Sequence, residues 1–106
     1  MFPGATQHQL DQIAELCRRF DVARLELFGS AANGTFDPAT SDLDFLATFR
    51  RHPLGSSPSK FERYFGFREG LEALFGRPID LVEPHTVRNP VLLRTIETSK
   101  KLLYAA

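Results

Sequence analysis

Apolar and polar positions alternate along this chain in two different ways. Apolar side chains recur at helical spacing in some segments and at every second position in others, which predicts amphipathic helices and strands respectively. The predicted helices cover residues 8–20, 60–75 and 91–98, and the predicted strands cover residues 23–28, 42–49 and 79–82. Residues 101–105 are either a last strand or a tail. This order predicts an α+β fold, with a small mixed central β-sheet flanked by helices.

Capping residues support two of these helices. Thr6 stands where an N-cap is expected, and Ser59 is followed three residues later by Glu62, as in a capping box. We expect the side chains Phe61, Tyr64, Phe65, Leu71, Leu74 and Phe75 to form the apolar side of helix 60–75, with Arg68 interrupting them. Gly66 and Gly70 weaken this helix, each by roughly 1 kcal/mol relative to alanine where the position is interior and exposed.

Length and charge restrict the classes of protein to consider. The 106 residues predict one domain, residues 1–106, and the 13 basic residues equal the 13 acidic ones. Because nucleic-acid-binding proteins usually carry a basic excess, direct nucleic-acid binding is not expected. No apolar run reaches the length of a membrane span, no signal peptide precedes the first helix, and Cys17 is the single cysteine. A cytoplasmic protein is therefore expected.

Two carboxylates and a small turn suggest chemistry on phosphates. Asp42 and Asp44 are two residues apart in a predicted strand, so their side chains point to the same side and could share a divalent cation. Gly29 and Ser30 end the preceding apolar strand. A glycine-containing turn lets backbone N–H groups approach an anion closely, which favours a bound phosphate. The combination predicts metal-assisted nucleotidyl transfer.

A third carboxylate completes this set. Asp80 interrupts the apolar strand 79–82, where a carboxylate is costly unless it faces a cation or water. Mg²⁺ prefers oxygen ligands and keeps several waters, so two or three carboxylates plus substrate phosphates suffice to bind it. Two such ions can activate the attacking oxygen and stabilise the leaving group. We therefore predict that Asp42, Asp44 and Asp80 are the metal-binding and catalytic residues.

These motifs resemble those of the minimal nucleotidyltransferases (MNT), a family that includes antitoxins, within the DNA polymerase beta-like nucleotidyltransferase superfamily. The matching segments are residues 28–30, 41–46 and 78–82, and the resemblance extends over nearly the whole chain. It implies a nucleotidyltransferase-like core in which Gly29 and Ser30 contact the nucleotide phosphates. It also implies that Asp42 and Asp44 hold two Mg²⁺ ions, and that Asp80 completes the site and helps to activate the acceptor hydroxyl.

The resemblance also implies a partner. Small MNT proteins are often antitoxins of HEPN-type ribonuclease toxins, and some transfer AMP from ATP to a tyrosine of the toxin. One position departs from the family pattern, because Asn33 stands where arginine is usual. Arg50, Arg51 or Lys60 would then have to supply that cation. The alternative is an antitoxin with weak or no catalysis that neutralises its partner by binding. Whether the chain forms homo- or hetero-oligomers stays open.

Overall fold

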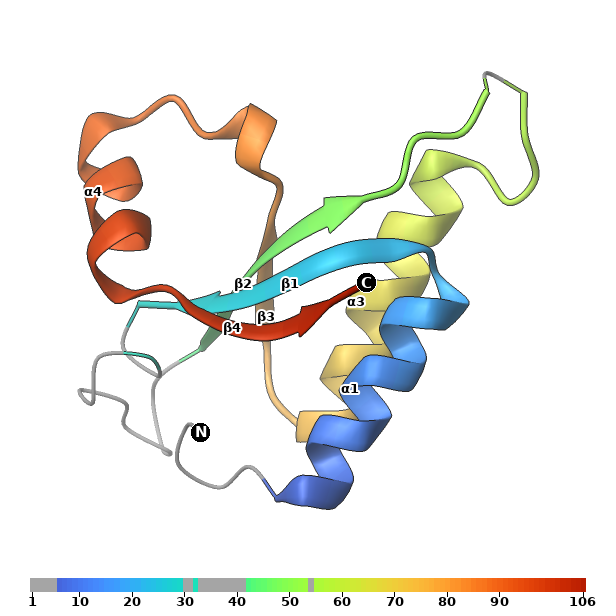
Figure 1. Ribbon diagram of the computed structural model, residues 1–106, viewed down its shortest axis with the longest axis horizontal. Helices are drawn as coiled ribbons and strands as arrows, with labels where there is room; N and C mark the ends of the chain where they lie inside the picture. The colour runs from blue at the N-terminus through green and yellow to red at the C-terminus, as the bar shows by residue number, and fades with distance from the viewer. Residues whose placement is uncertain (1–5, 30–31, 33–41, 54) are drawn as a thin grey trace.

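The computed structural model describes residues 6–29, 32, 42–53 and 55–106 (Figure 1). The asparagine at position 33 and the serine at position 30 lie outside these residues. The elements follow one another as α1 (Gln7–Arg19), β1 (Val22–Phe28), β2 (Leu43–Phe49), α3 (Lys60–Phe75), β3 (Ile79–Val82), the 3₁₀ turn η1 (Pro84–Thr86), α4 (Pro90–Ser99) and β4 (Lys101–Ala105). The predicted α+β class is confirmed, and the predicted helix and strand boundaries hold to within a residue or two. None of the described helices is long and apolar enough to cross a membrane.

Local hydrogen bonds explain where the two long helices begin and end. The Gln9 N–H donates to the Thr6 hydroxyl (3.1 Å) and the Thr6 N–H donates back to the Gln9 side chain (3.0 Å). Ser59 and Glu62 form the same reciprocal pair at the start of α3, which confirms the predicted capping box. Gly76 ends α3 with a left-handed backbone (φ 64°), a conformation that glycine adopts without strain.

The strands form one mixed sheet in the order β3-β2-β1-β4. Strands β2 and β3 run parallel, whereas β1 runs antiparallel to both β2 and β4. Residues 101–105 therefore form a strand, and the alternative of a tail is wrong. Since β1 ends where β2 and β3 begin, residues from three separate parts of the chain meet at one end of the sheet.

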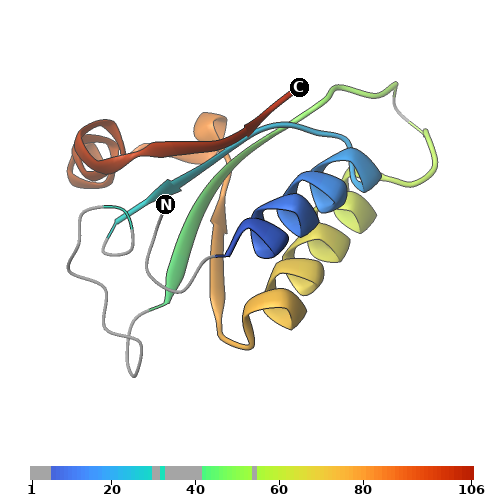
Figure 2. The same cartoon turned by 60° about the horizontal axis from the view of Figure 1, so that its bottom comes forward.

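Two apolar clusters hold the layers together. Figure 2 shows α1 and α3 side by side on one face of the sheet, with α4 beyond the other. The larger cluster joins α1 and α3 to the sheet and includes Ile13, Leu25, Phe45, Phe67 and Leu71. On the other face, the smaller cluster joins Phe28 and Leu46 to Ile96 of α4. Strand alternation explains this division, because successive side chains of β2 point to opposite faces.

The predicted apolar side of α3 is confirmed in part, because Leu71 is buried and Tyr64, Leu74 and Phe75 pack against the larger cluster. The buried residues of α3 are Arg63, Phe67 and Leu71, at intervals of four, whereas Phe61 is 70% exposed and Phe65 is 38% exposed. The two exposed rings pack on each other, with centroids 4.6 Å apart. The prediction was therefore wrong for Phe61 and Phe65, and it left out Phe67, which is buried. Contact between α3 and α1 also requires small residues on the adjoining side of α3.

Gly66 and Gly70 provide that close contact. A Cβ atom on Gly66 would lie 2.5 Å from Cε1 of Phe20, and one on Gly70 would lie 2.7 Å from Cδ2 of Leu16. The Phe20 ring is rigid and also packs edge-on against Phe67, at a centroid distance of 6.4 Å. These glycines are therefore packing positions between α1 and α3.

This packing reverses the effect expected from helix propensity. Propensity alone would make Gly66→Ala stabilising by about 1 kcal/mol. Because the added methyl group would displace the Phe20 ring, we expect Gly66→Ala to lower the free energy of unfolding by about 1–3 kcal/mol. Urea denaturation measures this difference, and Glu69→Ala, at an exposed position of the same helix, is the control. A stabilised Gly66→Ala variant would contradict the close packing of α1 and α3.

Candidate active site

Strand register brings the three predicted carboxylates to one end of the sheet. In the parallel β2–β3 ladder, Asp44 is the register partner of Asp80, and Phe28 at the end of β1 lies opposite Asp44 on the other side. Asp42 comes one residue before β2 begins. Asp42 and Asp80 are exposed, whereas Asp44 is partly buried. The sequence placed Asp42 and Asp44 together by alternation, and the parallel pairing adds Asp80.

These carboxylates affect one another electrostatically. Burial, and after it the negative charges of Asp80 and Asp42, together raise the pKa of Asp44 to about 6. A carboxylate in this setting gains from a cation nearby, because the cation offsets both the desolvation and the like-charge repulsion.

Removing the Asp44 charge should therefore stabilise the metal-free protein. Since the folded pKa lies above the unfolded value, ionisation costs more in the folded state, and this part of the stability is lost as pH rises from about 4 through about 6. We expect Asp44→Asn to raise the free energy of unfolding at pH 7.5 by about 1 kcal/mol, after allowing for solvent screening. Urea denaturation in EDTA at pH 4.5 and pH 7.5 measures the difference, which should be small at the lower pH. A variant less stable than the wild type at pH 7.5 would contradict the cost of ionising Asp44 in the folded protein.

Gly29 approaches the central carboxylate more closely than any other residue type could. Its φ is +75°, and a Cβ atom at this position would lie 2.5 Å from Oδ2 of Asp44. Gly29 thus satisfies two requirements at once, a left-handed turn after β1 and free space beside the carboxylate. The predicted phosphate turn lies next to the carboxylates in space, although the structure of Ser30 is not described.

The hydroxyl of Ser99 is part of this turn, and the sequence did not reveal it. The Gly29 N–H donates to Ser99 Oγ (2.9 Å), and Ser99 Oγ in turn donates to the Thr95 carbonyl of α4 (2.5 Å). The pairing of Leu27 with Lys101 in the β1–β4 ladder explains the contact, because it brings residues 29 and 99 together across the sheet. The Gly29 N–H is therefore already bonded, and a phosphate at this turn would need other N–H groups.

The donor set suits Mg²⁺ in its chemistry. All three side chains offer carboxylate oxygens, the ligands that Mg²⁺ prefers. As their side chains stand, however, no group of three histidine, cysteine, aspartate or glutamate residues among the described residues is arranged to hold one ion. Mg²⁺ usually takes one or two carboxylates and completes its shell with waters and substrate phosphates. Asp42, Asp44 and Asp80 therefore fit such an ion, with substrate supplying the remaining ligands.

The cations proposed to replace the missing arginine lie elsewhere. Arg50 follows the far end of β2, six residues from Asp44, which corresponds to roughly 20 Å of extended strand. Arg51 and Lys60 line the same distant cavity as Arg50. An arginine side chain cannot span that distance, so Arg50 does not replace the family arginine at the Gly29 turn.

The match to known protein families now decides the identity of the chain. A model of the nucleotidyltransferase domain matches residues 10–103, a range that begins within α1 and ends within β4. This chain belongs to the nucleotidyltransferase domain family. It is therefore a nucleotidyltransferase.

Individual relatives agree with this assignment. The chain is 30% identical over 96 residues to MJ1379 of Methanocaldococcus jannaschii, which is assigned as a protein adenylyltransferase, and the match covers 83% of this chain and 91% of that protein. A solved structure assigned as a minimal nucleotidyltransferase superposes with a TM-score of 0.68 at 24% identity, over 90% of this chain and 89% of that chain. A structure of a tri-AMPylated Shewanella oneidensis HEPN toxin in complex with an MNT antitoxin matches with a TM-score of 0.60 at 19% identity, over 94% of this chain and 72% of that chain. These structural matches show that the fold is that of minimal nucleotidyltransferases.

Proposed function

We propose that this nucleotidyltransferase uses Mg²⁺ to transfer AMP from ATP to a tyrosine of a HEPN-type toxin, and so acts as the antitoxin of that toxin. The observation that carries the proposal is the meeting of Asp42, Asp44 and Asp80 at one end of the sheet, beside the Gly29 turn. The choice of AMP and of a protein acceptor draws on the assignment of the MJ1379 relative and on the AMPylated HEPN toxin of the Shewanella oneidensis complex.

Each residue has a defined role in this proposal. Asp42 and Asp44 would hold two Mg²⁺ ions, which supply positive charge at the nucleotide phosphates when bound. Gly29 and Ser30 would position the triphosphate. Asp80 would complete the site and accept the proton of the tyrosine hydroxyl as that oxygen attacks.

The reaction is a displacement at the α-phosphorus of ATP. The tyrosine oxygen forms a bond to the α-phosphorus while the bond to the bridging oxygen breaks, and pyrophosphate leaves with the bonding electrons. The hydroxyl proton passes to Asp80. Catalysis would then depend on positioning and charge stabilisation, as is usual for transfer at phosphorus.

A test of lasting inactivation separates transfer from simple binding. The HEPN-type partner is incubated with this chain, ATP and Mg²⁺, the two proteins are separated under mild denaturation, and the ribonuclease activity of the refolded partner is measured. We expect the partner to stay inactive after ATP and Mg²⁺ treatment, and to regain activity when ATP is left out. Recovery of activity in both samples would mean that the chain neutralises its partner by binding alone.

A further inference from the structure

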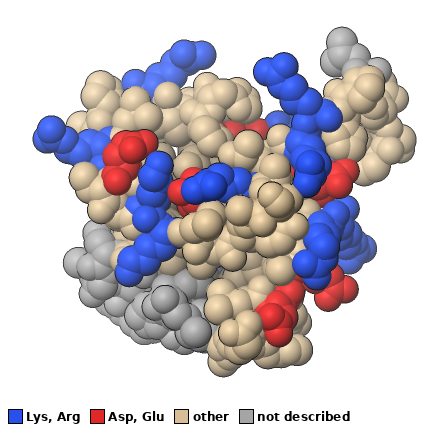
Figure 3. Space-filling view, in the orientation of Figure 1, with Lys and Arg blue, Asp and Glu red and all other residues tan. Residues whose placement is uncertain are grey.

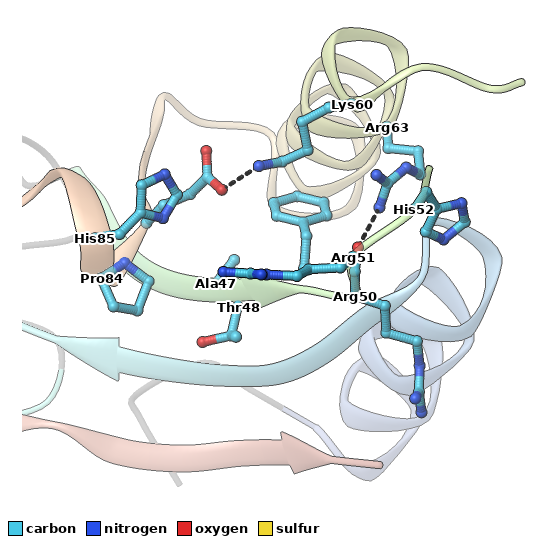
Figure 4. Close-up of a pocket in the computed structure, with 11 residues that line it drawn as sticks. Ala47, Thr48, Arg50, Arg51, His52, Lys60, Arg63, Pro84 and His85 are labelled. Atoms are coloured by element: carbon cyan, nitrogen blue, oxygen red, sulfur yellow. Dashed lines mark hydrogen bonds and ion pairs between the residues drawn. The ribbon is translucent and has the colours of Figure 1, made fainter. Parts of the chain in front are cut away.

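A cavity lies at the other end of β2, away from the three carboxylates. It has a volume of about 560 Å³ and lies between the end of β2, the loop that follows, the start of α3 and the start of η1 (Figure 4). This volume is within the range of small-molecule sites. Since Asp44 is near one end of β2 and Arg50 follows the other, a ligand in this cavity would not contact the carboxylates.

The lining of this cavity is strongly basic although the chain has no net charge. Its charged side chains are one carboxylate, from Glu83, and four cations, from Arg50, Arg51, Lys60 and Arg63; His52 and His85 also border it. Figure 3 shows basic and acidic side chains mixed over the visible face of the molecule. Positive charge is therefore concentrated in the cavity, where concave walls strengthen its attraction for an anion.

The side chains of the cavity differ in how far they are already engaged. Lys60 forms an ion pair with Glu83 and lies over the Phe49 ring, with Nζ 5.1 Å from its centroid. Figure 4 shows Arg51 extended back along β2 towards Pro84 and His85, while Arg50 points the other way. Among the described residues, Arg51 has no ion-pair partner. Its guanidinium group is thus available to a ligand.

Arg63 places buried positive charge at the wall of the cavity. It is only 3% exposed, yet its Nε has no hydrogen-bond partner within the described part of the chain. Its Nη1 donates a hydrogen bond to the Arg50 carbonyl (3.2 Å). A buried guanidinium is costly unless negative charge lies nearby, and an anion in the cavity would supply that charge to Arg63, which lines it.

From these observations we infer that the cavity is a second, anion-binding site, which takes a polyphosphate group, either inorganic or carried by a nucleotide. Phosphate fits better than a carboxylate ligand, because Arg51, Lys60 and Arg63 border the cavity and each phosphate offers several acceptor oxygens to planar guanidinium groups. The site does not use the carboxylates and is independent of the proposed AMP transfer.

Calorimetric titration with tripolyphosphate in EDTA tests this site without metal or ATP. We expect saturable binding of one tripolyphosphate per chain, weakened about tenfold or more in Arg51→Gln, which removes one charge-assisted contact. The matched control is Arg18→Gln, at an exposed position of α1 outside the cavity, which should bind within about twofold of the wild type. A parallel titration with ATP in EDTA separates the two sources of the ligand: equal affinity indicates recognition of the phosphates alone, and tighter binding indicates that the nucleoside also contributes.

Amide chemical shifts then locate the ligand on the protein. Tripolyphosphate should shift the backbone signals of Thr48, Lys60 and His85, and leave those of Gly29 and Asp80 in place. Absence of saturable binding, equal weakening in Arg18→Gln, or shifts centred on Gly29 and Asp80 would each overturn the inference. None of these results depends on whether AMP is transferred.

Discussion

Asp42→Asn and Asp44→Asn are each expected to lower the rate of AMP transfer by about a thousandfold or more. Both carboxylates lie at the sheet end where the Mg²⁺ ions would bind, and asparagine offers a neutral oxygen in place of a charged one. Groups that stabilise the charge developing on a transferring phosphoryl group typically contribute two to three orders of magnitude each. Transfer rates measured with radiolabelled ATP, the HEPN-type partner and saturating Mg²⁺ give the comparison.

The fold should survive these substitutions. Asp42 is exposed, and loss of the Asp44 charge relieves repulsion from Asp80. Asp11→Asn is the matched control, because Asp11 is an exposed carboxylate of α1 that accepts a hydrogen bond from Gln7 in its own helix. It should transfer AMP at the wild-type rate. Retained transfer in either Asp42→Asn or Asp44→Asn, with unchanged circular dichroism, would refute the assignment of these carboxylates.

Gly29→Ala is expected to abolish most of the transfer activity as well. The substituted residue would have to adopt a φ of +75°, which costs about 1–2 kcal/mol for a side chain with a Cβ atom. Its methyl group would also overlap Oδ2 of Asp44, at 2.5 Å. Since the carboxylate must then move, we expect transfer to fall by about a hundredfold or more, as measured by the same rate assay.

Gly55→Ala separates the two causes. Gly55 also has a positive φ, of +84°, but nothing lies within 4 Å of a Cβ atom there. Both variants should lose stability from backbone strain, with a larger loss in Gly29→Ala because of the overlap with Asp44, as measured by urea denaturation, while Gly55→Ala keeps its transfer activity. Equal activity in the two variants would mean that contact between Gly29 and Asp44 is unimportant for the site.

Local patterns in the sequence were sufficient to predict most of the fold. Caps such as Thr6 and Ser59 act within one turn of helix, and the alternation along β2 depends only on neighbouring residues. The same alternation places Asp42 and Asp44 on one side. Asp80 was predicted because a carboxylate between Ile79 and Leu81 requires an explanation, and the parallel ladder puts it beside Asp44.

Features that depend on contacts distant in sequence were not predicted. Helix propensity indicated only that Gly66 weakens α3. The residue that it packs against, Phe20 at the end of α1, is distant in sequence. Ser99 lies 70 residues after Gly29 in the sequence, and the two meet because β4 pairs with β1. The basic cavity likewise joins the end of β2 to the residues after β3, and no motif within either segment indicates it.

The most direct test of the proposed activity is the intact mass of the HEPN-type partner after incubation with this chain, ATP and Mg²⁺. We expect the partner to gain the mass of one or more whole adenylyl groups, and fragmentation to place them on a tyrosine. The gain should disappear with Asp42→Asn and with EDTA. An unchanged partner mass in the presence of a stable complex would contradict AMP transfer and leave binding as the means of neutralisation.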